Sequence, residues 1–364
     1  MKQEREFGGI SLAAAGAVVM LAQGFHPILL ASIKLGQTAA WLAMLLAGLL
    51  ALAFYLAAAA PLQDIPTGNL IDLARAAAGR PGAIITALLV CSTLVFHAAL
   101  IVRQTSEMAV GAIYTHTPQT FATVTLIGCT LYAAYGNLAA VVRLARGFLP
   151  VLLLAILLIL VGGSAWGRPR FLLPFWGPGP GRLVLGASTL AGLFCPLVLF
   201  LLIAADGLRD RNRLPRAGVM AIGGSALVLT LIKVVLLMSY PVPLGYSITF
   251  PLHELARLVV GGRFFERIEG LWVIVWVFAT ACHLGALLHA AARAFTAAFD
   301  IPSYRPAVLP LVFVAMVAAF FPHDQGQSVA WGQQVLPLYV AVGMVLPVTL
   351  ALAVTIRRWI RRAA

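Results

Sequence analysis

Apolar residues fill long runs that recur from one end of the chain to the other, with short polar or basic segments between them. Most runs are about 20 residues long, the length that an α-helix needs to cross the hydrocarbon core of a bilayer. The pattern therefore predicts about ten transmembrane helices. The predicted spans cover residues 8–33, 37–60, 82–111, 118–136, 147–166, 184–206, 215–241, 267–297, 305–322 and 334–358.

The first span is interrupted near its middle, in the stretch "MLAQGFHPILL" (20–30). Gly24 and Pro27 weaken a helix, and Gln23 and His26 are costly to expose to lipid. Irregular backbone is tolerated at this depth where it lines a cavity or is buried in protein. The stretch is either a functional break beside a binding site or a simple kink, since Gly and Pro are common in membrane helices.

The sixth span carries a second interruption, Gly192 and Pro196 in "LAGLFCPLVLF" (190–200). The two breaks open the first and the second group of five helices. Paired breaks in corresponding positions of two halves indicate the binding site of a secondary transporter. We therefore predict one transmembrane domain over residues 1–364, with a first repeat over about 8–166 and a second over about 184–358.

Polar residues share one face of the third predicted span. Thr93, His97, Gln104 and Glu107 recur at helical spacing, and such residues usually face the interior of a bundle. Arg103 and Glu107 form an i,i+4 pair near the outer end of this span. The pair is either an ion pair at the membrane interface or an extracellular gate.

The eighth predicted span has a similar face, formed by Trp276, Thr280 and His283. Trp276 is placed to form the wall of a pocket, and the two polar side chains either contact a ligand or form hydrogen bonds between helices. Lys233 in the seventh span has two interpretations: it reaches outward to the membrane surface, or it neutralises a buried carboxylate or carbonyl.

Composition agrees with a membrane protein and excludes several other classes. The chain is 62% hydrophobic and only 10% charged, with a mean hydropathy of +0.98, whereas soluble domains are about 25% charged. The net charge of +13 comes from basic residues in short loops, which set membrane orientation and do not indicate binding of nucleic acid. Their distribution predicts that both termini are cytoplasmic. Nucleophile, phosphate-binding and metal-binding motifs are absent from the sequence, so we predict no enzyme, cofactor or metal.

Two connecting segments are predicted to contain short helices. The segment 61–82 favours a cytoplasmic interfacial helix around residues 68–78. The segment 249–269 favours a short helix that begins at Pro251, a preferred first-turn residue, and a turn at Gly261 and Gly262.

Two longer stretches carry a family resemblance. "FPLHELARLVVGGRFFERIEGLWVIVW" (250–276) has a Pro-led external segment that runs into Glu-Arg-x-Glu and a Trp on the eighth span. "THTPQTFATVTLIGCTLYAAYGNLAAVVRLARGFLPV" (115–151) has a Thr-Pro entry to the fourth span, a Gly after it, and the Arg and Pro that follow. Together with the two breaks, these patterns resemble the B subunit of spore-germination receptors, in the amino acid–polyamine–organocation transporter superfamily.

The resemblance implies a LeuT-like 5+5 inverted repeat, all-α, with discontinuous helices one and six. It implies a multi-pass protein of the spore inner membrane that contacts lipids and assembles with an A subunit and a C-subunit lipoprotein. In this fold, spans one, three, six and eight line the ligand site. The implied ligand-binding residues are Gln23, Gly24, Phe25, His26, Pro27, Thr93, His97, Gly192, Phe194, Cys195, Trp276, Thr280 and His283.

Three functions are compatible with these features. The leading hypothesis is a germinant-sensing subunit that binds a small nutrient, typically an L-amino acid, and triggers germination. The alternative is an active amino-acid permease of the same fold, coupled to an ion or a proton. The third is a scaffold or channel part with a vestigial site.

Overall fold

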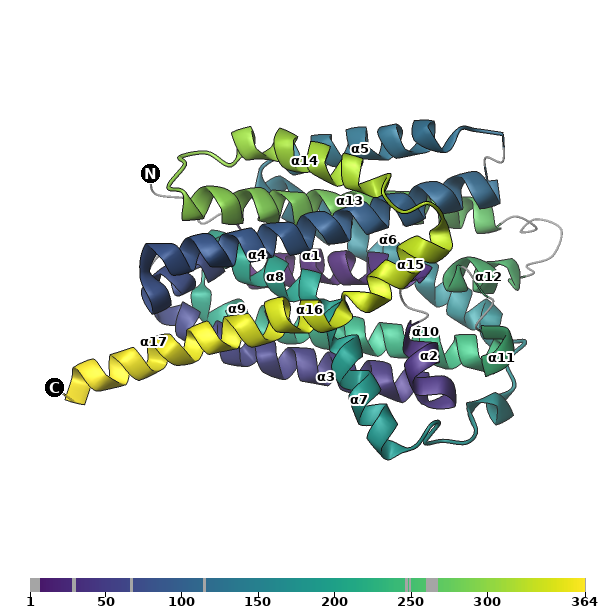
Figure 1. The fold of residues 1–364 in the computed structure, drawn as a ribbon. Helices are drawn as coiled ribbons and strands as arrows, with labels where there is room; N and C mark the ends of the chain where they lie inside the picture. Colours follow the sequence, from purple (N-terminus) through teal and green to yellow (C-terminus); the bar gives the residue numbers. More distant parts are fainter. Residues whose placement is uncertain are drawn as a thin grey trace.

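The computed structural model describes residues 7–27, 31–65, 68–113, 116–245, 248, 250–259 and 268–363. Within them regular structure is helical, apart from one isolated bridge between Phe7 and Leu208. Long helices lie side by side along a common direction, and the first helix, Gly9–Ala22, begins at the same end of the bundle at which the last helix, Leu346–Ala363, ends (Figure 1). We call this the terminal end and the other the far end.

Every predicted span corresponds to a helix. In the described residues, seven helical segments are long and apolar enough to cross a membrane by length and composition, namely Ala31–Asp64, Leu70–Gly111, Leu138–Ser164, Pro180–Gly207, Arg211–Ser239, Trp272–Ala298 and Leu336–Ile360. The remaining three predicted spans are the shorter helices α1 (Gly9–Ala22), α5 (Gln119–Tyr135) and α14 (Arg305–Ala319).

Several segments consist of more than one helix. The other helices are α2 (Ala31–Gly36), α3 (Ala40–Ala59), α4 (Leu70–Met108), α6 (Leu138–Ser164), α7 (Pro180–Leu190), α8 (Cys195–Ile203), α9 (Leu214–Gly218), α10 (Gly224–Ser239), α11 (Val242–Gly245), α12 (Pro251–Arg257), α13 (Ile268–Ala298), α15 (Gln325–Gln334), α16 (Leu336–Val340) and α17 (Leu346–Ala363). Short π-helical segments join α9 to α10 and α16 to α17.

The discontinuity predicted in span one is present. Helix α1 ends at Ala22, and Gln23–Phe25 form a 3-10 turn. His26 is extended (φ −89°, ψ 148°), and helical structure resumes in α2 at Ala31. The backbone therefore leaves the helix where Gly24 and Pro27 predict it.

Span six is interrupted more mildly. A 3-10 turn, Ala191–Phe194, separates α7 from α8, and its residues keep right-handed helical angles at both ends. Figure 1 shows that α7 and α8 nevertheless point in different directions. This break changes the direction of the helix without an extended residue.

The predicted interfacial helix is the first part of α4. Asn69 caps it, accepting hydrogen bonds from the backbone N–H groups of Ile71 and Asp72. Gly79 has φ 70°, a conformation that favours glycine, and it redirects the chain into span three. The predicted helix at Pro251 is α12, and the predicted turn at Gly261 and Gly262 lies outside the described residues.

One predicted boundary was wrong, and one helix was not predicted. Span five begins at Leu138, not 147, because Asn137 caps α6 and the helix continues through the arginines that made this segment look like a loop. Helix α15 was missed altogether. Its sequence, QGQSVAWGQQ, is polar, and Asp324 caps it by accepting from the Gln327 N–H at 2.7 Å.

Span ten packs closely against the break in span six. A Cβ atom at Gly192 would collide with the carbonyl oxygen of Leu336, and a Cβ at Gly343 would lie 2.7 Å from the Cβ of Cys195. Only glycine allows these backbones to approach so closely. The two glycines therefore hold spans six and ten together.

Replacing Gly192 with valine is expected to lower the free energy of unfolding by about 1–3 kcal/mol, because overpacking forces the backbone of α16 away from the 3-10 turn. Thermal unfolding of the purified protein measures this. Gly128→Ala on α5 is the control, since a Cβ there meets nothing within 4 Å. It should leave stability unchanged or raise it slightly. Equal behaviour of the two variants would contradict the packing role.

Candidate functional site

The predicted polar face of α13 lies in the interior of the bundle, packed against α1 and α4. Trp276, Thr280 and His283 are each fully buried. The Nδ1 atom of His283 lies 2.6 Å from the carbonyl oxygen of Val19 on α1. Because a carbonyl only accepts, Nδ1 carries the hydrogen and donates it, which leaves Nε2 as an acceptor in the neutral ring.

His97 of α4 lies beside His283. The two ring centroids are 5.5 Å apart in an edge-to-face arrangement. On its other side, His97 lies 5.7 Å from the ring of Tyr339 on α16. The site therefore joins spans three, eight and ten.

The break in span one contacts the same face of α13. The ring of Phe25 lies 4.6 Å from Trp272 and 6.4 Å from Trp276, and His26 lies 6.0 Å from Trp276. All these side chains are at most 2% exposed, so the site is closed to solvent in this conformation. Trp272 therefore packs inside the bundle.

We call Gln23, His26, His97, Trp276, Thr280, His283 and Tyr339 the inner polar cluster. Each has at least one buried polar atom without a hydrogen-bond partner within the described structure, namely Gln23 Oε1, His26 Nε2, both ring nitrogens of His97, Trp276 Nε1, Thr280 Oγ1, His283 Nε2 and the Tyr339 hydroxyl. Buried polar groups are normally paired, and leaving one unpaired costs about 1–3 kcal/mol. Such a concentration indicates groups that a ligand would satisfy.

The predicted residues of span six pack against spans two and ten. Gly192 packs against Leu336, and Cys195 packs against Gly343. The ring of Phe194 lies against Gly48 of α3. Span six thus supports the cluster by holding spans two and ten in place.

The other predicted residues support the site from within span one and span three. A Cβ atom at Gly24 would lie 3.3 Å from Leu229 and 3.5 Å from Leu252, so Gly24 packs against α10 and α12. Pro27 is buried after the break, and Thr93 is buried one turn before His97. Tyr339 is the member that the sequence did not reveal, because span ten reads as an ordinary apolar run around it.

The inner polar cluster contains histidines and uncharged groups but no carboxylate. In the part of the chain that the structure describes, no group of three His, Cys, Asp or Glu residues could hold a metal ion. Lys233 is fully buried in α10, so the interpretation in which it reaches outward is wrong. A ligand would therefore meet hydrogen-bonding groups and aromatic rings at the cluster.

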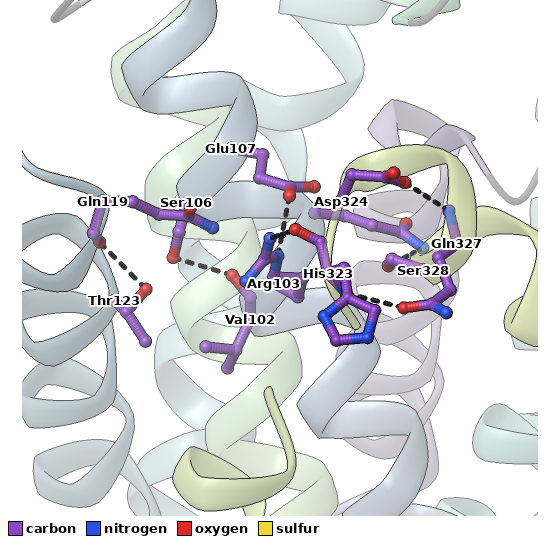
Figure 2. Close-up of polar contacts among 11 residues, drawn as sticks. Val102, Arg103, Ser106, Glu107, Gln119, Thr123, His323, Asp324, Gln327 and Ser328 are labelled. Carbon is purple, nitrogen blue, oxygen red and sulfur yellow. Dashed lines mark hydrogen bonds and ion pairs between the residues drawn. The ribbon is translucent and has the colours of Figure 1, made fainter. Parts of the chain in front are cut away.

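The predicted Arg103–Glu107 pair forms at the far end of α4. Arg103 Nε lies 2.7 Å from Glu107 Oε1, and the side chains are only 9% and 12% exposed. Arg103 also donates from Nη2 to the carbonyl oxygen of His323 at 2.9 Å, as Figure 2 shows. The pair thus ties span three to the connection between spans nine and ten.

Helix α15 lies across this end of α4. Gln104 Nε2 donates to Ser328 Oγ at 3.2 Å. Phe96 stacks on Trp331 with centroids 6.5 Å apart, and Lys34 Nζ donates to Gln333 Oε1 at 3.3 Å. Helix α15 therefore connects span three to α2.

Comparison with known proteins agrees with this architecture. The spore germination protein family matches residues 14–328. The chain belongs to this family. None of the curated proteins matches the chain.

The fold of this spore germination protein is similar to a solved transporter structure. That structure is Mhp1, a nucleobase-cation-symport-1 family transporter, in a closed conformation with bromovinylhydantoin bound. The TM-score is 0.68 at 14% sequence identity, covering 94% of this chain and 76% of Mhp1. The predicted 5+5 transporter fold is thereby confirmed, and with it an integral membrane protein.

Proposed function

We propose that this chain is the germinant-sensing subunit of a spore germination receptor, and that it binds a small nutrient, an L-amino acid, at the inner polar cluster. The observation that carries the proposal is the set of buried polar atoms without partners beside the break in span one. A purely structural core would pair these atoms or replace them with apolar groups.

The cluster suits a small zwitterion. Helix α1 ends at the cluster, and the C-terminal end of a helix carries partial negative charge, which favours an ammonium group. Trp276 Nε1 is a donor only, and neutral His97 offers one N–H, so both suit a carboxylate. The rings of Phe25 and Trp272 cover one side for an apolar side chain.

Sensing requires that the ligand bind one of two conformations more tightly, since a ligand shifts an equilibrium only by its differential affinity. The site described here is closed to solvent, so ligand entry would require a second, open conformation. An A subunit and a C-subunit lipoprotein would convert the shift into ion release in the spore inner membrane, with both termini of this chain on the cytoplasmic side. Gly24 and Gly192, at the two breaks, are where the backbone would move.

The replacement Thr280→Val tests the site. Because Thr280 Oγ1 has no partner, its removal should leave thermal stability unchanged or raised, yet weaken ligand binding about tenfold. The measurement is the thermal shift of the purified chain with each of the twenty L-amino acids. Thr296→Val, on the same helix, is the matched control, since Thr296 Oγ1 donates to Ala292 O at 2.9 Å. It should leave binding unchanged.

An active amino-acid permease is the second candidate, favoured by the similarity of the fold to a transporter. Proteoliposomes that contain this chain alone distinguish the two functions. Sustained uptake of a labelled amino acid that also shifts the melting temperature would identify a permease. Binding without uptake would support the sensor, and no shift with any amino acid would contradict an amino-acid site.

A further inference from the structure

A groove opens at the terminal end of the bundle, between the end of α3 and helix α17. Its volume is about 410 Å³. In Figure 1, α17 crosses the bundle obliquely and its last turns extend beyond the neighbouring helices. The groove is lined by Ala57, Ala60, Pro61, Asp64, Val348, Ala351, Leu352, Thr355, Arg358 and Trp359.

The lining changes from apolar to polar along the helix. Val348 and Leu352 line the inner part, whereas Thr355, Arg358 and Trp359 line the outer part. The helix rises by roughly 16 Å from Val348 to Trp359, at about 1.5 Å per residue. This is about half of the roughly 30 Å hydrocarbon core, the depth of one leaflet.

The last part of α17, from the outer part of the groove onward, is rich in arginine. Helix α17 carries four arginines in its last two turns, at positions 357, 358, 361 and 362. Arg358 Nη1 lies 2.8 Å from Asp64 Oδ2, and Asp64 is the one acidic residue in the lining. Clusters of four or more arginines directly beside a transmembrane helix attract anionic lipid headgroups.

Trp359 and the exposed apolar face of α17 indicate that a lipid, not water, covers the groove. Trp359 is 72% exposed, and Leu352, Ile356 and Ile360 are more than half exposed on the same helix. Tryptophan beside arginine is typical of the membrane interface, where an aromatic ring lies at headgroup depth.

We propose that this groove binds one anionic phospholipid from the leaflet at the terminal end. Its phosphate lies against Arg358, next to Trp359, and one acyl chain follows the apolar part between α3 and α17. The small side chains of Ala57, Ala60 and Ala351 leave the room for that chain.

The lipid would also fix the position of span ten. Helix α17 continues from the π-helical segment Ala341–Val345, in which Gly343 packs on Cys195 at the start of α8. A molecule bound between α3 and α17 therefore stabilises the same helix that contributes Tyr339 to the inner polar cluster.

The test uses the full-length chain purified in detergent, stripped of lipid and mixed with either phosphatidylcholine or phosphatidylglycerol. Phosphatidylglycerol should remain bound in native mass spectra and raise the melting temperature, whereas phosphatidylcholine should do neither. Arg358→Gln should lower retention of phosphatidylglycerol about fivefold. Arg143→Gln, an exposed arginine on α6 outside the groove, should leave retention unchanged.

The replacement Asp64→Asn separates a lipid site from a structural ion pair. If Arg358 serves the phosphate, removing the competing carboxylate should maintain or increase retention of phosphatidylglycerol. If Arg358 serves only the ion pair, Asp64→Asn and Arg358→Gln should lower stability by the same amount, and neither should change the retention of phosphatidylglycerol. That result would overturn the proposal. Equal retention of the two lipids, or equal effects of Arg358→Gln and Arg143→Gln, would overturn it as well.

Discussion

Replacing Arg103 with glutamine is expected to lower the free energy of unfolding by about 3 kcal/mol. The change leaves the carboxylate of Glu107 almost buried without its cation, and it removes the hydrogen bond to the His323 carbonyl. Thermal unfolding of the purified chain should show a drop of several degrees in the melting temperature.

Two further variants identify the cause. Arg103→Gln combined with Glu107→Gln should recover part of the loss, because no unpaired charge then remains buried. Glu254→Gln removes one partner of an exposed pair, Arg257–Glu254 at 3.4 Å, and should cost at most about 1 kcal/mol. If Arg103→Gln costs no more than Glu254→Gln, the far-end pair is an ordinary surface contact.

The outcome also decides between the two interpretations of this pair. An ion pair at the membrane interface would be solvated, and either partner could be removed at little cost. The structure instead buries the pair and connects it to the segment that leads into α15. That arrangement favours the second interpretation, an extracellular gate, which stays a prediction.

The course of the backbone could be predicted from local pattern. The two breaks were found because Gly24 and Pro27, like Gly192 and Pro196, are helix-weakening residues in apolar surroundings. The interior face of α13 was found because Thr280 follows Trp276 by four residues and His283 follows by seven. Each of these features depends on residues close together in the sequence, within one turn or one helix.

Features that depend on distant contacts could not be predicted. Helix α15 is mostly polar in sequence, and its position depends on contacts with α4 such as Phe96–Trp331. Most helical stability in proteins comes from such packing and not from intrinsic propensity. Tyr339 was missed for the same reason, since only the approach of span ten to His97 distinguishes it from a tyrosine at the membrane interface.

The roles of the span-six glycine and cysteine show the same limit. The break in span six marked Gly192 and Cys195 as ligand contacts, yet both pack against span ten. A glycine that permits a turn and a glycine that permits close approach of two backbones look identical in sequence. Their assignment as ligand-binding residues stays a prediction. The contacts observed show them packing span six against span ten.

Replacing His97 with phenylalanine is expected to raise the germinant concentration for half-maximal response by about 10-fold to 100-fold. The aromatic ring still packs between His283 and Tyr339, but both unpaired nitrogens are removed. A hydrogen bond to a charged ligand group contributes about 1.5–3 kcal/mol, which corresponds to this range. The measurement is germination of spores that carry the complete receptor, with the amino acid that gives the largest thermal shift.

His289→Phe is the matched control, and the two variants should behave in opposite ways. His289 is also buried on α13, but its Nδ1 lies 3.1 Å from the carbonyl oxygen of Ala134 and its ring packs on Tyr304. Its replacement should therefore lower the free energy of unfolding and leave the germinant concentration for half-maximal response unchanged. His97→Phe should preserve or raise stability, since it removes two unpaired buried nitrogens, and impair the response. A normal response with His97→Phe would show that the inner polar cluster does not contact the germinant.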